Sequence, residues 1–269
     1  MKEHLNLSAY NNIEDLKNFT EEQFCNYCDD KLASCEKHLH FINNLTLPKN
    51  FNICEIGSGN SKLLYQLELH KKINKGIGIE ISQSRYNFAE KFKSYVKSQK
   101  VENINKNIFD VTPDEKFDLI IAVDIVLQLI TPISDDAESK LMTWIYQNLK
   151  EDGYIILELW SFSSILKKLS LTENSLCTWE EFPASDPFKY ILSNISLDKD
   201  NNISWKKKFI KKDSYEESVF NNILKPYTKE QMSNLLSKYG FKNIEIFDFW
   251  KEKNDCIQDE YIIIAKKQG

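Results

Sequence analysis

Glycine is scarce in this sequence, with seven residues among 269, and arginine occurs only once, at Arg85. Four of the seven glycines fall between Gly57 and Gly78, which indicates a place where the backbone turns tightly or approaches a ligand. Long apolar runs are also missing: the longest, LIIAVDIVLQLI, carries Asp124 and is too short to cross a bilayer. The first residues, MKEHLNLSAYNNIEDL, are polar and contain no signal-peptide core. We therefore expect no membrane association and a cytoplasmic location.

Histidine is also scarce, with four residues, and the chain has no net positive charge. The net charge is −5 and charges of both signs are interspersed, so nucleic acid is an unfavoured partner. Six cysteines in a cytoplasmic chain are expected to stay reduced. A run of three cysteines and two histidines could form a zinc site: Cys25, Cys28, Cys35, His38 and His40. The cysteine spacing also fits the buried face of a helix, where cysteine is a common small core residue, and we expect no metal.

Residues 1–48 have the pattern of helices. Apolar side chains recur at spacings of three and four at Phe24, Cys28, Leu32, Cys35, Leu39 and Ile42. Thr20 followed by Gln23 predicts an N-terminal capping box, and Pro48 ends the region.

Strand and helix patterns alternate from residue 51 to 160, which predicts a parallel sheet covered on both faces. The expected strands are FNICEI, GIGIEI, INKNIFD, FDLIIAVDIV and GYIILELW, with Gly153 as a stop signal for the helix before the last one. Residues 161–227 interrupt this pattern, and KYILSNISLD and NISWKKKFI, joined by KDNN, predict a short hairpin. A final helix capped by Thr228 and ended by Gly240 precedes two strands, IEIFDFW and EYIIIAKK, expected to pair antiparallel.

The segment EIGSGNS follows the first strand and opens a helix, and the next strand ends at Glu80. This order is the plan of a nucleotide-binding βαβ unit. The dinucleotide fingerprint needs a third glycine where this chain has Lys62, which disfavours NAD or FAD. Glu55 adds a carboxylate that suits a cationic group better than a pyrophosphate.

Five segments in this order resemble the class I S-adenosylmethionine (SAM) methyltransferases: CEIGSGNS, GIGIEIS, NIFDVT, FDLIIAVDIVLQLI and LKEDGYIILE. The resemblance implies an α/β fold with a doubly wound, seven-stranded, mostly parallel Rossmann-like sheet. It divides the chain into an N-terminal helical lid (1–48), a SAM-binding core (49–160), a small substrate cap insertion (161–227) and a final helix and strands that complete the sheet (228–269).

The same resemblance implies positions for the cofactor. Gly57 and Gly59 would form the loop beneath its methionine part, and Glu55 would orient the amino group. Glu80 would accept from both ribose hydroxyls, because a carboxylate has two acceptor oxygens for two donors.

The adenine end and the amino acid end follow by the same likeness. Ile81 would pack on the adenine face and Asp110 would accept from the adenine amino group, with backbone contacts from Phe109 or Val111. Asp124 would face the amino acid end of the cofactor.

No catalytic base stands out in the sequence. Tyr10 is a candidate for closing over the cofactor, and the candidates for a base are His4, Tyr190, Tyr215 and Glu158. The resemblance implies methyl transfer to O or N of a small metabolite, such as a nucleotide-linked sugar or a surface-polysaccharide precursor, by a monomer or homodimer. An NAD-dependent oxidoreductase, a non-catalytic SAM-binding partner protein and a protein or RNA methyltransferase remain alternatives.

Overall fold

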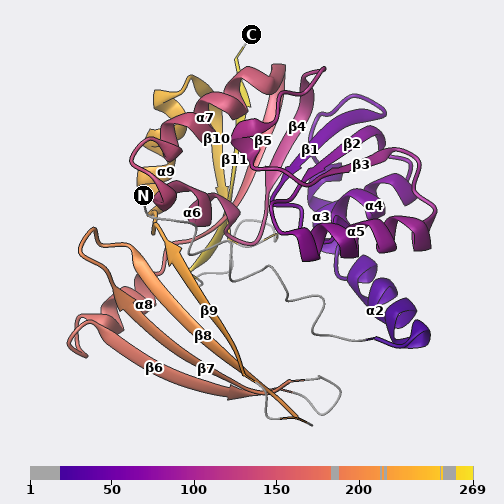
Figure 1. Cartoon of the computed structure of the whole chain (residues 1–269). Helices are drawn as coiled ribbons and strands as arrows, with labels where there is room; N and C mark the ends of the chain where they lie inside the picture. The colour runs from indigo at the N-terminus through magenta and orange to yellow at the C-terminus, as the bar shows by residue number, and fades with distance from the viewer. Residues whose placement is uncertain are drawn as a thin grey trace.

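The computed structural model describes residues 19–182, 188–212, 214, 217–248, 250 and 259–268. They form a seven-stranded sheet with helices on both faces and a separate four-stranded sheet beyond one end of its strands (Figure 1). The strand order is β10-β11-β5-β4-β1-β2-β3 in the larger sheet and β6-β7-β8-β9 in the smaller one.

The central sheet confirms the predicted seven-stranded, mostly parallel arrangement. Its strands are β1 (Phe51–Ile56), β2 (Ile73–Ile79), β3 (Val101–Ile104), β4 (Phe117–Ala122), β5 (Leu149–Trp160), β10 (Phe241–Phe247) and β11 (Glu260–Lys267). The strands β1 to β5 pair in parallel, whereas β11 runs antiparallel to both β5 and β10, as expected for the last two strands.

Two hydrophobic clusters hold the layers together, one on each face of the sheet. Alternate residues of β1 enter different clusters: Cys54 and Ile56 face one, and Phe51 and Ile53 face the other. The first cluster is covered by α6 (Val126–Ile130), α7 (Ala137–Asn148) and α9 (Lys229–Lys238). The second is covered by α2 (Glu21–Ala33), α3 (Glu36–Asn43), α4 (Lys62–Leu69) and α5 (Gln83–Val96). The sequence of a strand that is buried on both faces is a continuous apolar run. This is why the central strands could be predicted from the sequence.

From residue 19 on, where the structure describes it, the N-terminal region contains two helices that meet at Ser34 and Cys35. The predicted capping box is present, because Thr20 accepts from the Gln23 amide and the Gln23 side chain accepts from the Thr20 amide. Cys28 and Cys35 are fully buried in the second cluster, and burial raises the pKa of each thiol to about 12. Their helical spacing is therefore explained by core packing.

Two expected boundaries are wrong. The segment INKNIFD is not a strand: β3 ends at Ile104, and η2 (Ile108–Asp110) is a turn of 3-10 helix. The Asn107 side chain accepts from the Phe109 amide and starts this turn, an alternative that short polar side chains offer the backbone. Gly153 does not end a helix, because α7 ends at Asn148 and Gly153 lies within β5.

The insertion after β5 is larger than the predicted short hairpin. It contains α8 (Ser163–Leu169) and the cap sheet of β6 (Ser175–Glu181), β7 (Phe188–Leu197), β8 (Ile203–Lys211) and β9 (Glu217–Leu224). The hairpin of β7 and β8 is confirmed, and β6 and β9 add an antiparallel strand on each side. Both added strands lack a clear apolar alternation, since β6 is almost wholly exposed and β9 contains two successive asparagines.

The two faces of the cap sheet differ. The inner face carries Ile195, Ile203, Trp205 and Leu224, which pack with α8 and with Leu129 of α6. The outer face carries Trp179, Leu192 and Val219, which are 65%, 41% and 59% exposed. None of the described helices is both long and apolar enough to cross a membrane.

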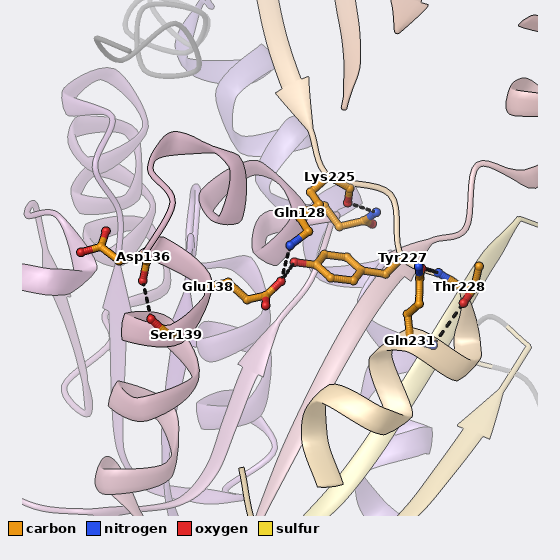
Figure 2. A network of polar contacts seen from close by, with 8 residues as sticks. All are labelled: Gln128, Asp136, Glu138, Ser139, Lys225, Tyr227, Thr228 and Gln231. Carbon is orange, nitrogen blue, oxygen red and sulfur yellow. Dashed lines mark hydrogen bonds and ion pairs between the residues drawn. The ribbon is translucent and has the colours of Figure 1, made fainter. Parts of the chain in front are cut away.

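Gln128 of α6 ties both ends of the insertion to the core. Its amide group donates to the carbonyl oxygens of Trp160 (2.8 Å) and Lys225 (3.0 Å), and its oxygen accepts from the Trp160 amide (2.7 Å). Beside it, Lys225 and Tyr227 converge on Glu138 at the start of α7 (Figure 2). The entry and the exit of the cap insertion are thereby both fixed to α6, and the exit is also fixed to α7.

Candidate cofactor site

A cavity of about 390 Å³ lies at the carboxyl ends of β1, β2 and β4. In this sheet β2 and β3 lie on one side of β1, and β4 and β5 lie on the other side. The strand order therefore reverses its direction at β1. Ligands of doubly wound α/β proteins bind in the crevice at such a switch point. The volume falls within the range of small-molecule sites.

The loop between β1 and α4 forms the floor of the cavity. Gly57 and Gly59 adopt φ values of +65° and +56°, a region that favours glycine. A Cβ atom on Gly57 would lie 2.6 Å from the Val126 side chain, so this position has no room for another residue. The amides of Gly57 and Ser58 both donate to the Ile79 carbonyl oxygen, at 2.8 and 3.1 Å, which holds the loop against β2.

Glu80 lies just beyond the end of β2 and is 6% exposed. One carboxylate oxygen accepts from the Gly59 amide and the other from the Ser82 amide, both at 2.8 Å. Each oxygen has a second lone pair for another donor. Glu80 therefore shapes the glycine loop and still offers two acceptors at the wall of the cavity.

Glu55 lines the cavity at the end of β1 and is 2% exposed. Among the described residues, nothing donates a hydrogen bond to its Oε2 atom. Burial raises the pKa of Glu55 to about 8; Lys62 opposes this shift, and Asp124 and Glu80 add to it. A carboxyl group held neutral in this way would become charged beside a cation, so the site suits an ammonium or sulfonium ligand.

Two further predicted residues also line the cavity. Ile81 is 40% exposed next to Glu80, and Asp124 lies in the turn between β4 and α6 with a φ of +54°. With Glu55, Gly57, Gly59 and Glu80, they form one continuous wall.

The three residues expected at the adenine end do not line the cavity. Asp110 is exposed, Phe109 packs on the first cluster, and the Val111 carbonyl accepts from the Trp144 indole at 2.8 Å. The wall is formed instead by Lys106, Asn107 and Ile108. A strand was expected over INKNIFD, and the cavity-lining loop was therefore expected to begin after it. Asn107 was the signal that the strand ends earlier, because asparagine is a residue type that starts turns.

Sequence reasoning also missed the far wall of the cavity. These lining residues come from two places: Tyr27 and Lys31 from α2, and Leu129, Ile130 and Ile133 from α6 and the turn after it. The basic side chains around the cavity come from four separate segments: Lys31, Lys62, Arg85 and Lys106. No sequence pattern relates these positions, because α2 and α5 are brought together only by tertiary packing.

The two candidate catalytic residues that the structure describes, Tyr190 and Glu158, do not line this cavity. Tyr190 lies on the outer face of the cap sheet, 5.8 Å from the Trp179 ring. Glu158 is buried behind the cavity and accepts from the Trp250 indole at 3.0 Å; burial raises its pKa to about 7, with Asp124 adding to the shift. His4, Tyr10 and Tyr215 lie outside the described residues.

Comparisons with known proteins agree with this geometry. The family model described as "Methyltransferase domain" matches residues 47–182, about half of the chain. The chain therefore belongs to this family, and it is a SAM-dependent methyltransferase.

Individual proteins with similar sequence or structure are distant. The carboxy-S-adenosyl-L-methionine synthase of Nautilia profundicola is 27% identical over 207 residues, which are 75% of this chain and 76% of that protein. A SAM-dependent methyltransferase of Clostridium acetobutylicum has a TM-score of 0.69 at 17% identity, covering 97% of this chain and 96% of that one. CalS10 of Micromonospora echinaspora, an amino pentose methyltransferase solved with SAM, has a TM-score of 0.58 at 10% identity and covers 94% of both chains.

Proposed function

We propose that this methyltransferase transfers the SAM methyl group to an oxygen or nitrogen atom of a small metabolite, with a nucleotide-linked sugar as the leading class. The observation that carries the proposal is the cap sheet, whose apolar and aromatic inner face packs on α6 beside the cofactor cavity. A small molecule fits such a covered site better than a nucleic acid, which needs an open basic groove. CalS10, which shares this fold, is an amino pentose methyltransferase.

The described residues fit SAM at this cavity. Glu80 would accept from the two ribose hydroxyls through the lone pairs that the Gly59 and Ser82 amides leave free. Glu55 would take the charged amino group, which would lower its raised pKa.

The remaining contacts follow from the walls of the cavity. Asp124 would face the amino acid end, and Ile81 the adenine ring. We place the edge of the adenine against Asn107 and Ile108, instead of Phe109, Asp110 and Val111, because only the former pair lines the cavity.

Bound SAM supplies an electrophilic methyl group on its sulfonium. The chain's part is to hold the acceptor atom in line with the sulfur–methyl bond and to keep water out. Transfer would convert SAM to S-adenosylhomocysteine and methylate the acceptor atom, whose proton would pass to solvent.

A second candidate rests on the relatives named carboxy-S-adenosyl-L-methionine synthase, which match three quarters of this chain. In that case the methyl carbon of SAM would lose a proton and form a bond to a carboxyl group given up by a carboxylic acid co-substrate, which would yield carboxy-SAM. The same cofactor cavity would serve both functions, and the products separate them.

Calorimetric titration with S-adenosylhomocysteine (SAH), with Glu80→Ala and NAD as comparisons, tests the cofactor. Saturable SAH binding that Glu80→Ala weakens supports the proposed site, whereas binding that is equal in both proteins overturns it. Mass spectrometry then tests the reaction after incubation with SAM and, in parallel, with a panel of nucleotide-linked sugars or a panel of carboxylic acids as carboxyl donors. A methylated sugar with equimolar SAH supports the proposal, carboxylated SAM supports the second candidate, and SAH binding without methylation of any sugar rejects nucleotide-linked sugars as the acceptor class.

A further inference from the structure

A second cluster of polar side chains lies on the inner face of the cap sheet, outside the cofactor cavity. Trp205 of β8 stacks on Trp160 at the end of β5, with ring centres 5.9 Å apart and planes 15° apart. The Nε1 atom of Trp205 is buried, and no hydrogen-bond acceptor contacts it among the described residues. A buried indole N–H normally has a partner, so this donor is available to a ligand.

Lys207 lies two residues further along β8, on the same face. Its ammonium nitrogen is 3.8 Å from the centre of the Trp205 ring. Its direct neighbours on the adjacent strands are neutral, Ser193 on β7 and Phe220 on β9. Among the described residues, no carboxylate forms an ion pair with Lys207, whereas Lys208 on the outer face pairs with Glu217 at 2.7 Å.

Arg85 brings a second positive charge from the core. It lies on α5 and lines the cofactor cavity. Its Nη1 atom is 3.4 Å from the point where a Cβ atom on Gly59 would lie. Burial lowers the pKa of Lys207 to about 8, and the like charge of Arg85 adds to this shift. Lys207 itself has only neutral neighbours on the adjacent strands, so an anion bound beside it would be stabilised by a charge that no carboxylate of the described residues neutralises.

We infer that the acceptor carries an oxyanion, a carboxylate or a phosphate, which Lys207 and the Trp205 indole bind on the inner face of the cap sheet. This inference rests on the proposed function and narrows its substrate class. Both groups are donors and one is a cation, which is the complement of an oxyanion and not of a neutral hydroxyl. Leu129 packs in the same cluster as Trp205 and also lines the cofactor cavity, so this face lies beside the proposed place of the methyl donor. The anion would therefore orient the acceptor towards the sulfonium.

The test is calorimetric titration of the SAH-saturated protein with pyrophosphate and, separately, with malonate. We expect saturable binding of at least one anion, weakened about tenfold or more by Lys207→Met and recovered by Lys207→Arg, because a charged donor is lost and restored. The matched control is Lys206→Met, the adjacent exposed lysine on the outer face of the same strand, which should bind like wild type. Tighter pyrophosphate binding identifies a phosphate-bearing acceptor, and tighter malonate binding a carboxylate-bearing one.

Two results overturn the inference: neither anion binds wild type, or Lys207→Met binds as tightly as Lys206→Met. Each variant is also titrated with SAH alone, so that a folding defect is not mistaken for loss of the anion site. If wild type binds SAH but no anion, the inference fails and the proposed function stands. If wild type fails to bind SAH, the proposed function fails and the acceptor assignment fails with it.

Discussion

Two buried carboxylates at the cavity differ in how their oxygens are used. Glu80 receives two backbone amides at 2.8 Å, whereas Glu55 has an oxygen without a donor among the described residues and a pKa raised to about 8 by burial. The first group shapes the loop and the second is poised for a cation. Their responses to substitution and to pH should therefore differ.

Replacing Glu80 with alanine should weaken SAH binding at least tenfold, about 1.4 kcal/mol or more. The variant loses both ribose acceptors, and it also frees the Gly59 and Ser82 amides that the carboxylate holds in place. Calorimetry on Glu80→Ala measures the change. Glu102→Gln, an exposed carboxylate on β3 paired with Lys75 at 3.7 Å, is the control and should bind SAH like wild type.

SAH affinity should rise with pH as Glu55 ionises, levelling off above its pKa of about 8, because the ligand's ammonium favours the carboxylate form. Binding at neutral pH should release a proton, measurable by calorimetry in buffers of different ionisation enthalpy. Glu55→Gln should remove both effects. An unchanged pH profile in that variant would contradict the assignment of Glu55 to the amino group.

The same shift has a consequence for the empty protein. Folding raises the pKa of Glu55 from 4.5 to about 8, so the folded state binds this proton more tightly than the unfolded chain. The resulting stabilisation is complete below pH 4.5 and is lost as the pH rises through about 8. Urea unfolding measures this effect. The free energy of unfolding of wild type minus that of Glu55→Gln should fall as the pH rises across this range. A difference that rises with pH would contradict the shift.

At the residue scale, the sequence predicted positions that one local segment determines. The glycine turn and Glu80 follow from a strand, a turn and a helix in succession, and they line the cavity as expected. Lys106 and Asn107 were missed as cavity-lining residues because a strand was expected where the structure has a turn that begins at Asn107. Lys31 was missed because exposed and buried lysines look alike without tertiary context.

At the scale of elements, Gln128 of α6 is the point where the cap insertion leaves and rejoins the core. It is fully buried, and its amide pairs with backbone groups of Trp160 and Lys225. Glu138 of α7 reinforces the same joint through Lys225 and Tyr227 (Figure 2). The orientation of the cap sheet thus depends on a few polar contacts at its base.

Replacing Gln128 with leucine should lower the free energy of unfolding by about 2–4 kcal/mol, because buried backbone groups of Trp160 and Lys225 lose their partners. Proteolysis within residues 161–227 should become faster than in wild type, since the joint is loosened. Denaturant unfolding and limited proteolysis measure the two effects. Gln83→Leu, on the exposed start of α5, should cost less than about 0.5 kcal/mol. Equal losses in both variants would contradict a special role for Gln128.

The elements that could be predicted from the sequence are those with a clear apolar pattern or clear capping residues. The strands β1 and β4 are buried on both faces, and the helix α9 has its capping box and its terminal glycine at a φ of +88°. The strand β6 is almost wholly exposed, and β9 places Asn221 and Asn222 in mid-strand. These two segments become strands because they pair with β7 and β8. The local sequence of a segment does not reveal such pairing.

At the scale of the whole molecule, the cap sheet and the core share one hydrophobic cluster. Ile195 and Ile203 of the cap sheet pack with Leu129, which also lines the cofactor cavity, and with Trp160 of β5. A ligand in the cavity therefore contacts an element that supports both sheets. We expect the two sheets to unfold together.

Heating should accordingly give one unfolding transition, with the same midpoint by far-UV circular dichroism and by tryptophan fluorescence. Trp205 reports on the cap sheet and Trp144 on the core. SAH at about 100 times its Kd should add about 2.7 kcal/mol to the free energy of unfolding. For a chain of this size, that corresponds to a rise of roughly 5–10 °C in Tm, and NAD at the same concentration should leave the Tm unchanged. Two separate transitions, with only the later one raised by SAH, would show that the contacts through Leu129 and Gln128 are too weak to couple the cap sheet to the cofactor site.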